Sequence, residues 1–185
     1  MRAFIAIHLP DFLHNSLGAA QEDFRRAAPD ARWSRPEGIH LTLKFLGEIS
    51  DARTKMVVEA LTQLGSFEPL EIEVRGFGFF PNEHRARIFW AGVNAPPALA
   101  KLAAKIEERL EKVGFAREGR AFSPHLTLAR FKVPRSQPEL SMAVAARATT
   151  SLGKFNASEF FLFESKLSPQ GSQYTKIMRF PKQTQ

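Results

Sequence analysis

The 185-residue sequence contains no cysteine, which excludes disulfides, a thiolate metal site and a cysteine nucleophile. It also lacks a Gly-x-Ser-x-Gly serine elbow, a Gly-x-x-x-x-Gly-Lys phosphate loop and a His-Glu-x-x-His zinc motif. No long run of Lys and Arg and no basic tail is present. Acyl transfer, P-loop chemistry and zinc chemistry are therefore not indicated, and we expect neither a metal nor a cofactor.

Long hydrophobic runs are absent as well. The apolar start over residues 3–7 is interrupted by His8 and closed by Pro10, which makes it too short for a signal peptide or a membrane span. We therefore expect a cytoplasmic monomer with no membrane contact. The composition, 44% hydrophobic with 17 Phe, supports a substantial core, and no linker divides the chain. We interpret residues 1–185 as one domain of two interlocked lobes.

The balance of charge is basic, with a formal net charge of +7. A basic protein favours polyanionic partners such as nucleic acid or nucleotides. A net charge of +7 is equally compatible with a charge that serves only solubility, so the composition leaves both interpretations open.

Five histidines are present, and two of them begin the same four residues: His40-Leu41-Thr42-Leu43 and His125-Leu126-Thr127-Leu128. Both stretches alternate and are rich in residues typical of strands. In a strand, His and Thr point to one face and the leucines to the other. Two such strands that face each other combine two imidazoles and two hydroxyls, that is an acid, a base and two oxyanion donors.

Periodicity predicts the elements around these motifs. We expect a helix from Asp11 that ends before Pro29, with Phe12 in its apolar stripe, and a helix over 51–64 with Met56 in its stripe. Helices are also expected from Pro96 to Gly114 and over 139–148. Strands are expected over 2–8, 39–46, 70–80, 87–93, 125–131, 154–164 and 174–180, loops over 33–38 and 134–138, and a turn over 168–171.

The order of elements repeats roughly once, and the two motifs start 85 residues apart, since 125 − 40 = 85. This predicts an ancient duplication: an α+β protein of two pseudo-twofold-related antiparallel sheets.

Paired imidazoles suit general acid–base catalysis, because imidazole titrates near neutrality. An in-line displacement at phosphorus needs one group to deprotonate the nucleophile and another to protonate the leaving oxygen. Threonine hydroxyls can donate to the non-bridging oxygens.

The two His-x-Thr-x motifs and their flanks resemble those of the 2H phosphoesterases, in particular the RNA 2′,3′-cyclic phosphodiesterases, historically called 2′–5′ RNA ligases or LigT-like proteins. The resemblance covers nearly the whole chain. It is carried by residues 2–7 before Leu9-Pro10, by 40–48, by 76–81, by 122–130, by 164–169 and by Tyr174-Thr175.

The resemblance implies a bilobal antiparallel fold with flanking helices and both motifs lining a central cleft. It implies metal-independent hydrolysis of a terminal RNA 2′,3′-cyclic phosphate to a 2′-phosphate. The older name of the family also implies a reversible 2′–5′ RNA ligation. His40 would be the proton donor to O3′, His125 the proton acceptor from water, and Thr42 and Thr127 the phosphate ligands. The near-symmetric local sequence leaves the acid and base assignment open without the resemblance.

Lys44 has the same parity as His40 and Thr42, which predicts a phosphate contact, with a solvated rim lysine as the alternative. Arg130 lies five positions after His125, so a regular strand points it away, and only a bulge or strand end would make it a ligand. Among the aromatic residues, Phe79 and Tyr174 are candidates to stack on a base, whereas Phe4 is expected in the core. The remaining histidines are expected outside the chemistry: His8 in a structural or rim role, His14 and His84 in solvent.

Two other functions are compatible with the sequence. One is a non-catalytic module that binds RNA or nucleotides, although binding alone does not require two imidazoles. The other is the same chemistry on a small cyclic nucleotide or a cyclic phosphate of ADP-ribose. The sequence does not separate RNA ends from these smaller substrates.

Overall fold

A computed structural model describes residues 1–169 and 171–182. The helices are α1 (Asp11–Arg25), α2 (Asp51–Thr62), α3 (Pro97–Glu111) and α4 (Pro138–Ala145), with short 3-10 turns at Pro36–Gly38 and Glu83–Arg85. The strands are β1 (Arg2–His8), β2 (Ala31–Trp33), β3 (His40–Glu48), β4 (Leu70–Phe80), β5 (Ala86–Asn94), β6 (His125–Arg135), β7 (Ser151–Ala157), β8 (Phe160–Ser168) and β9 (Gly171–Phe180).

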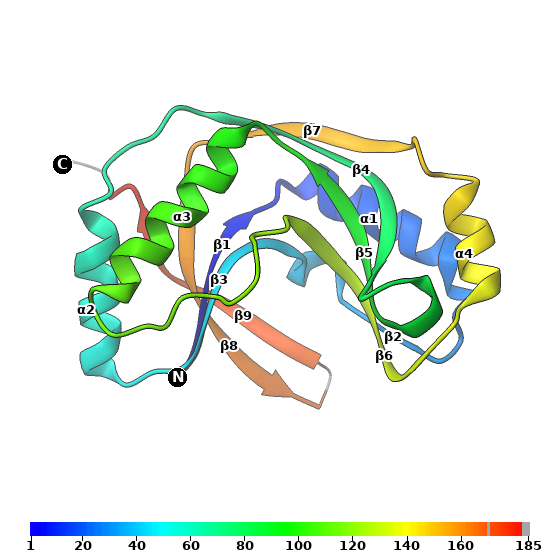
Figure 1. Ribbon diagram of the computed structural model, residues 1–185, viewed down its shortest axis with the longest axis horizontal. Coiled ribbons are helices and arrows are strands. Elements are labelled where there is room, and N and C mark those ends of the chain that lie inside the picture. The colour runs from blue at the N-terminus through cyan, green and yellow to red at the C-terminus, as the bar shows by residue number, and fades with distance from the viewer. Residues whose placement is uncertain (170, 183–185) are drawn as a thin grey trace.

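The strands form two antiparallel sheets (Figure 1). Sheet A has the order β3-β1-β8-β9 and contains the first motif at the start of β3. Sheet B has the order β2-β6-β5-β4-β7 and contains the second motif at the start of β6. The chain passes between the sheets several times, which confirms the predicted α+β architecture of two interlocked antiparallel lobes.

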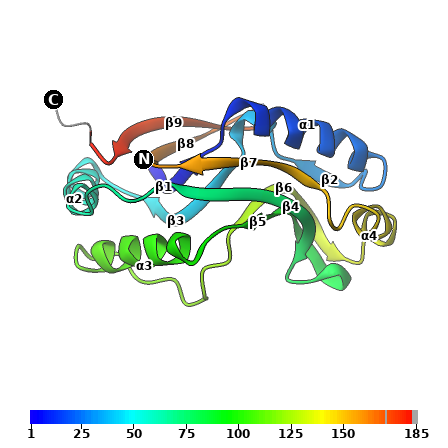
Figure 2. The same cartoon turned by 90° about the horizontal axis from the view of Figure 1, so that it is seen from above.

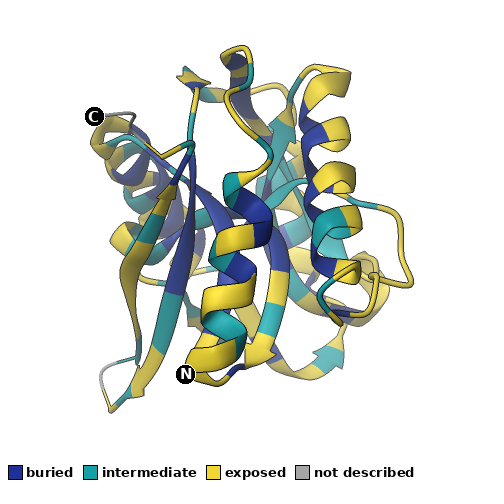
Figure 3. Cartoon of the chain, turned by 90° about the vertical axis from the view of Figure 1, so that its left-hand side faces the viewer, coloured by how far each residue is buried: buried dark blue, intermediate teal, exposed yellow. Residues whose placement is uncertain are grey.

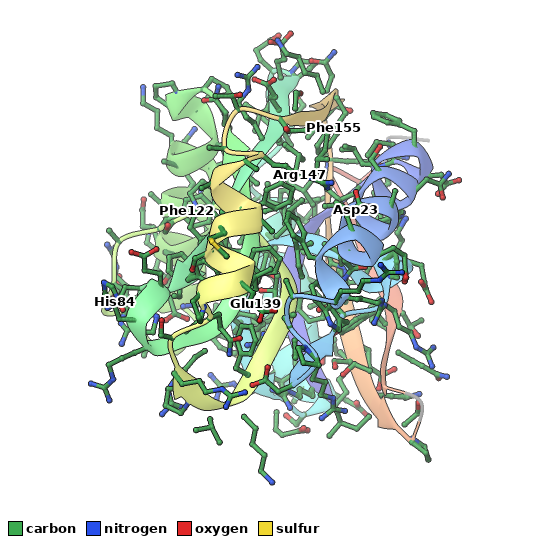
Figure 4. The ribbon with its side chains drawn as sticks, turned by 90° about the vertical axis from the view of Figure 1, so that its right-hand side faces the viewer. Asp23, His84, Phe122, Glu139, Arg147 and Phe155 are labelled. Atoms are coloured by element: carbon green, nitrogen blue, oxygen red, sulfur yellow. The ribbon has the colours of Figure 1, made fainter. Side chains whose placement is uncertain are left out.

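Helices cover the sheets from opposite sides, with α1 and α3 on either side of the strands in Figure 2. Helix α1 places Phe24 against Phe77 and Phe89 of sheet B, while α3 packs on β3 and on α2. Helix α4 lies beside α1 (Figure 4), where Arg147 donates to Asp23 at 2.6 Å. The helices bury one side and expose the other (Figure 3), as amphipathic periodicity requires.

One hydrophobic cluster spans both sheets and includes the motif leucines Leu41, Leu43, Leu126 and Leu128. A second, smaller cluster of Phe4, Ala6, Phe161 and Phe163 lies on the other face of sheet A. Sheet A is therefore apolar on both faces, as the unbroken run Ala3–Ile7 requires.

The structure corrects several expected elements. The strand predicted over 154–164 is two strands, β7 in sheet B and β8 in sheet A. Strand β2 lies partly in the predicted loop at 33–38, and β6 continues through Pro134 to Arg135. Phe12 and Met56 are exposed rather than in the apolar stripes. In the predicted turn at 168–171, Gln170 lies outside the described residues.

No helix among the described residues is long and apolar enough to cross a membrane.

Candidate active site

Both motifs have the predicted alternation. The leucines of each motif are buried in the same core, while His40, Thr42, His125 and Thr127 are half-buried on the opposite side of their strands. Strands β3 and β6 lie in contact with each other, so the two strands that carry the motifs adjoin over a shared apolar core.

Each motif strand carries a bulge at its second leucine. In β3, Thr42 pairs with Ala6 and Lys44 pairs with Ile5, so Leu43 is the extra residue. Directly paired residues in an antiparallel sheet share a face. Lys44 therefore shares the core face of Ile5, and the prediction that it shares the face of His40 is wrong.

The surroundings of Lys44 agree with this placement. Its ammonium donates to both carboxylate oxygens of Glu107 at 2.9 and 2.8 Å and to the Ala116 carbonyl at 2.7 Å. The Lys44 side chain is only 2% exposed. Its three donors are thus fully used by α3 and the segment that follows it, and Lys44 is a structural cation.

The matching bulge in β6 has the opposite consequence. Thr127 pairs with Trp90 and Arg130 pairs with Ile88, which makes Leu128 the extra residue. Because Trp90 and Ile88 are two positions apart in β5, Arg130 lies on the face of His125 and Thr127. A regular strand would have pointed Arg130 away from the motif. The bulge instead turns Arg130 toward the motif face, the second of the two arrangements considered from the sequence. In β3 the equivalent position is Phe45, which is 60% exposed.

His40 is enclosed by aromatic rings. It is stacked between Phe4, at a centroid distance of 4.9 Å, and Phe163, at 5.1 Å. Tyr174 makes an edge contact with it at 4.6 Å, so this candidate residue lies beside the first motif. Burial lowers the pKa of His40 to about 3, with smaller contributions from His8 and His14. The ring is therefore neutral near pH 7 in the free protein.

Two other histidines lie next to this motif. His8 is paired with His40 across β1 and β3, and its ring contacts that of His14 at 5.4 Å. His14 is buried, with Nε2 3.1 Å from the carbonyl oxygen of Ile39, so its expected exposure to solvent is wrong. His84 is exposed as predicted.

His125 is fixed by a hydrogen bond. Its Nδ1 lies 2.8 Å from the carbonyl oxygen of Ser123, and Phe80 contacts the ring edge-to-face at 4.8 Å. A carbonyl only accepts, so the neutral ring carries its proton on Nδ1 and leaves the Nε2 lone pair free. Burial lowers the pKa of His125, the hydrogen bond to Ser123 opposes this with a smaller rise, and the positive charge of Arg130 adds a still smaller lowering.

Phe79, predicted as a candidate to stack on a base, lies on the core face, and its neighbour Phe80 lies beside His125. Phe79 is paired with Phe89 and packs on the core, whereas Phe80 shares the face of Trp90 and His125. The indole of Trp90 lies across Gly78, where an added Cβ would stand 2.3 Å from the ring. The Gly78–Trp90 combination was the available signal for an aromatic side chain lying flat on this face.

Among residues 1–169 and 171–182, no three His, Asp or Glu side chains come together in a way that could hold a metal ion. The motifs therefore contribute two imidazoles, two hydroxyls and the guanidinium of Arg130. This set can move protons and bind an anionic oxygen.

The fold and the two motifs define a class, the two-lobed α+β proteins with one His-x-Thr strand in each lobe. The chain belongs to the LigT like Phosphoesterase family, whose model matches residues 7–90 and 92–174.

Curated relatives match nearly the whole chain. The chain is 32% identical over 181 residues to the RNA 2′,3′-cyclic phosphodiesterase of Methanothermobacter thermautotrophicus, covering 97% of this chain and 98% of the relative. It is 32% identical over 180 residues to the protein of the same name from Archaeoglobus fulgidus, covering 97% and 99%.

Solved structures share the fold. TT0787 of Thermus thermophilus superposes with a TM-score of 0.80 at 27% identity over 97% of both chains. E. coli LigT, solved in complex with 3′-AMP, superposes with a TM-score of 0.77 at 24% identity, covering 97% of this chain and 96% of that one.

Proposed function

We propose that this protein hydrolyses the 2′,3′-cyclic phosphate at the end of an RNA chain to a 2′-phosphate. The observation that carries the proposal is the pair of His-x-Thr strands, each with the same bulge, set in contact over one core. The name shared by full-length relatives supports the substrate class. In the proposed complex the cyclic phosphate lies between the two motifs.

His125 is the proton acceptor in this mechanism. Its Nδ1 proton is held by the Ser123 carbonyl, so Nε2 is the basic atom. Its lowered pKa keeps the ring neutral and able to accept a proton near pH 7. It takes one proton from the attacking water as the new P–O bond forms.

His40 is the proton donor. The P–O3′ bond breaks, and the leaving oxygen takes a proton from the His40 ring. Burial disfavours the charged ring in the free protein, but a phosphate anion beside it raises its pKa, because opposite charge favours the imidazolium. The faces of Phe4 and Phe163 present electron-rich π systems to the ring, which also suits a cation. Substrate and proton are thus bound together.

The remaining polar groups bind the phosphate. Thr42 and Thr127 donate hydroxyl hydrogen bonds to its non-bridging oxygens, and the guanidinium of Arg130 adds charge complementarity as negative charge grows. Tyr174 lies at the edge of His40 and forms a wall for the terminal nucleoside. No step requires a metal ion.

The experiment that tests this function is a substrate comparison with identification of the product. We expect turnover of a short RNA with a 2′,3′-cyclic phosphate end, and a product that carries its phosphate on O2′. Faster turnover of a free cyclic nucleotide or an ADP-ribose cyclic phosphate than of the RNA would instead identify a small-molecule enzyme. Binding of the RNA without turnover would identify a binding module.

A monomeric state and a cytoplasmic location accompany this proposal. Both are predictions from the sequence.

A further inference from the structure

The face of sheet B that carries His125 and Thr127, here called the motif face, can be mapped from strand register. One row across the sheet, from β4 to β2, consists of Phe80, Ile88, Arg130 and Arg32, since each is paired directly with the next. Paired residues share a face, so Arg32 of the edge strand β2 lies on the same face as the second motif, one strand beyond Arg130.

Lys132 extends this positive charge along β6. It follows Phe131, which is buried and paired with Ala31, and successive side chains in a strand point to opposite faces, so the exposed Lys132 lies on the side away from the core. Arg32, Arg130 and Lys132 are all exposed. From Arg130, the positive charge thus continues across the sheet to Arg32 on the edge strand and along β6 to Lys132.

These cations have no acidic partner. Among residues 1–169 and 171–182, Arg32, Arg130 and Lys132 make no ion pair with a carboxylate. Arg135, farther along the same strand, is paired with Asp30 at 2.8 Å, and Lys44 with Glu107 at 2.8 Å. Three positive charges without a carboxylate partner among the described residues therefore lie where β6 leaves the motif.

Aromatic rings border the motif on the other side. Phe80 and Trp90 lie on the motif face with a centroid distance of 5.3 Å, and Phe80 contacts His125. Aromatic side chains beside a row of cations are the usual surface for a single-stranded nucleic acid, because bases stack on the rings and the cations follow the phosphates. A free mononucleotide would use the aromatic side and leave the outer cations unused.

We propose that Arg32 and Lys132 form a subsite for the backbone phosphates on the 5′ side of the cyclic end, which makes single-stranded RNA, rather than a mononucleotide, the preferred substrate. The inference rests on the proposed function and adds a specificity determinant to it. Arg130 contacts the reacting phosphate, whereas Arg32 and Lys132 contact phosphates that take no part in the reaction. Their binding energy is the same in ground and transition states and affects mainly KM.

The test compares two substrates with the same reacting group. One is a 2′,3′-cyclic mononucleotide and the other a short single-stranded RNA with the same terminal nucleoside and cyclic phosphate. Arg32→Ala should lower kcat/KM for the RNA by about fivefold, the range of an exposed charge contact, through a higher KM with kcat unchanged. The mononucleotide should be hydrolysed at the wild-type rate.

Salt provides a second readout. For single strands, the slope of log affinity against log salt changes by about 0.7 for each phosphate neutralised. Arg32→Ala combined with Lys132→Ala should therefore flatten the dependence of RNA kcat/KM on salt by about 1.4, from two such contacts. Arg26→Ala is the matched control, because Arg26 is exposed at the end of α1, the helix that packs on the opposite face of the sheet.

The outcomes are distinct. An unchanged RNA kcat/KM in the double variant, or an equal loss with both substrates, would overturn the subsite. Failure of the wild-type protein to hydrolyse either substrate would overturn the proposed function itself, before any variant is compared.

Discussion

His40 and His125 are followed by the same three residues in sequence but have different neighbours in space. His40 is stacked between two phenylalanine rings with Tyr174 at its edge. His125 is anchored through Nδ1 to a backbone carbonyl and has one aromatic edge contact. The anchored ring presents a free Nε2 lone pair, as a base requires, and the stacked ring suits a proton held only when substrate is bound. These local contacts are the basis on which we propose His125 as the proton acceptor and His40 as the proton donor.

Arg130 gives a prediction at the scale of single residues. Burial and, to a smaller extent, the charge of Arg130 lower the pKa of His125, so the acidic limb of the kcat/KM profile, which reports the base in the free enzyme, should lie below pH 6.5. Arg130→Ala should move that limb to higher pH and lower kcat/KM about 10- to 100-fold through lost phosphate binding. Arg130→Lys keeps the charge and should leave the limb nearly in place. An acidic limb at the same pH in all three proteins would show that Arg130 does not act on His125.

The four motif side chains could be predicted from sequence because alternation holds over the first three residues of each motif. Lys44, Arg130 and Phe79 could not be placed, because their parity depends on irregularities that single residues do not encode. His14 was misjudged for a different reason: its helix is amphipathic, but the carbonyl of Ile39 that accepts from its ring lies 25 positions away in sequence.

At the scale of elements, the two bulges decide which side chains join the motifs. Each adds one residue at the second leucine, and each reverses the faces of the residues that follow directly, up to the next register shift of the strand. In β3 the reversal sends Lys44 into the core and exposes Phe45. In β6 it exposes Arg130 and buries Ala129. At the fifth position after the histidine, the duplicated motif thus presents a guanidinium in β6 and a phenylalanine ring in β3.

Lys44 gives the prediction for this scale. Lys44→Ala leaves the largely buried Glu107 carboxylate without its partner, so we expect a loss of about 3 kcal/mol in the free energy of unfolding. Lys44→Met combined with Glu107→Leu removes both charges and should recover most of that loss, measured by urea denaturation. At a temperature where the double variant is folded, its kcat/KM should stay within about twofold of wild type. A large loss of kcat in this folded variant would contradict the structural role of Lys44 and indicate that it binds the phosphate.

At the scale of the whole molecule, the two lobes are interlocked rather than sequential. Strands β1, β3, β8 and β9 form sheet A from both ends of the chain, and sheet B takes the edge strand β2 from the first half. The sequence indicated two related halves. It also predicted one strand over 154–164 where the structure has β7 and β8, because the apolar pattern hardly changes across Ser158 and Glu159. A crossing between sheets requires only this short break, which carries no strong turn signal.

The histidines make stability depend on pH. The pKa values of His8, His40 and His125 are all lowered in the folded protein, so the unfolded chain binds more protons below about pH 6.5. The stability that comes from keeping these histidines neutral is therefore fully present above that pH and is lost as pH falls toward 3. With its pKa at about 3, His40 alone should account for about 2 kcal/mol between pH 7 and pH 5.

Denaturant unfolding at these two pH values checks this prediction. In His40→Gln the loss of stability between them should be smaller by about 2 kcal/mol, whereas in His84→Gln, which removes an exposed imidazole, it should match wild type. Equal losses in wild type and His40→Gln would contradict the buried, neutral state assigned to His40.

The most direct test of the two-histidine mechanism is turnover of an RNA 2′,3′-cyclic phosphate end in the presence of EDTA, by wild type, His40→Ala and His125→Ala. We predict that wild-type activity survives chelation and that each variant, still folded, loses about 10²- to 10⁴-fold in kcat. Loss of wild-type activity in EDTA with recovery on adding a divalent ion, or near-normal turnover by either variant, would contradict it.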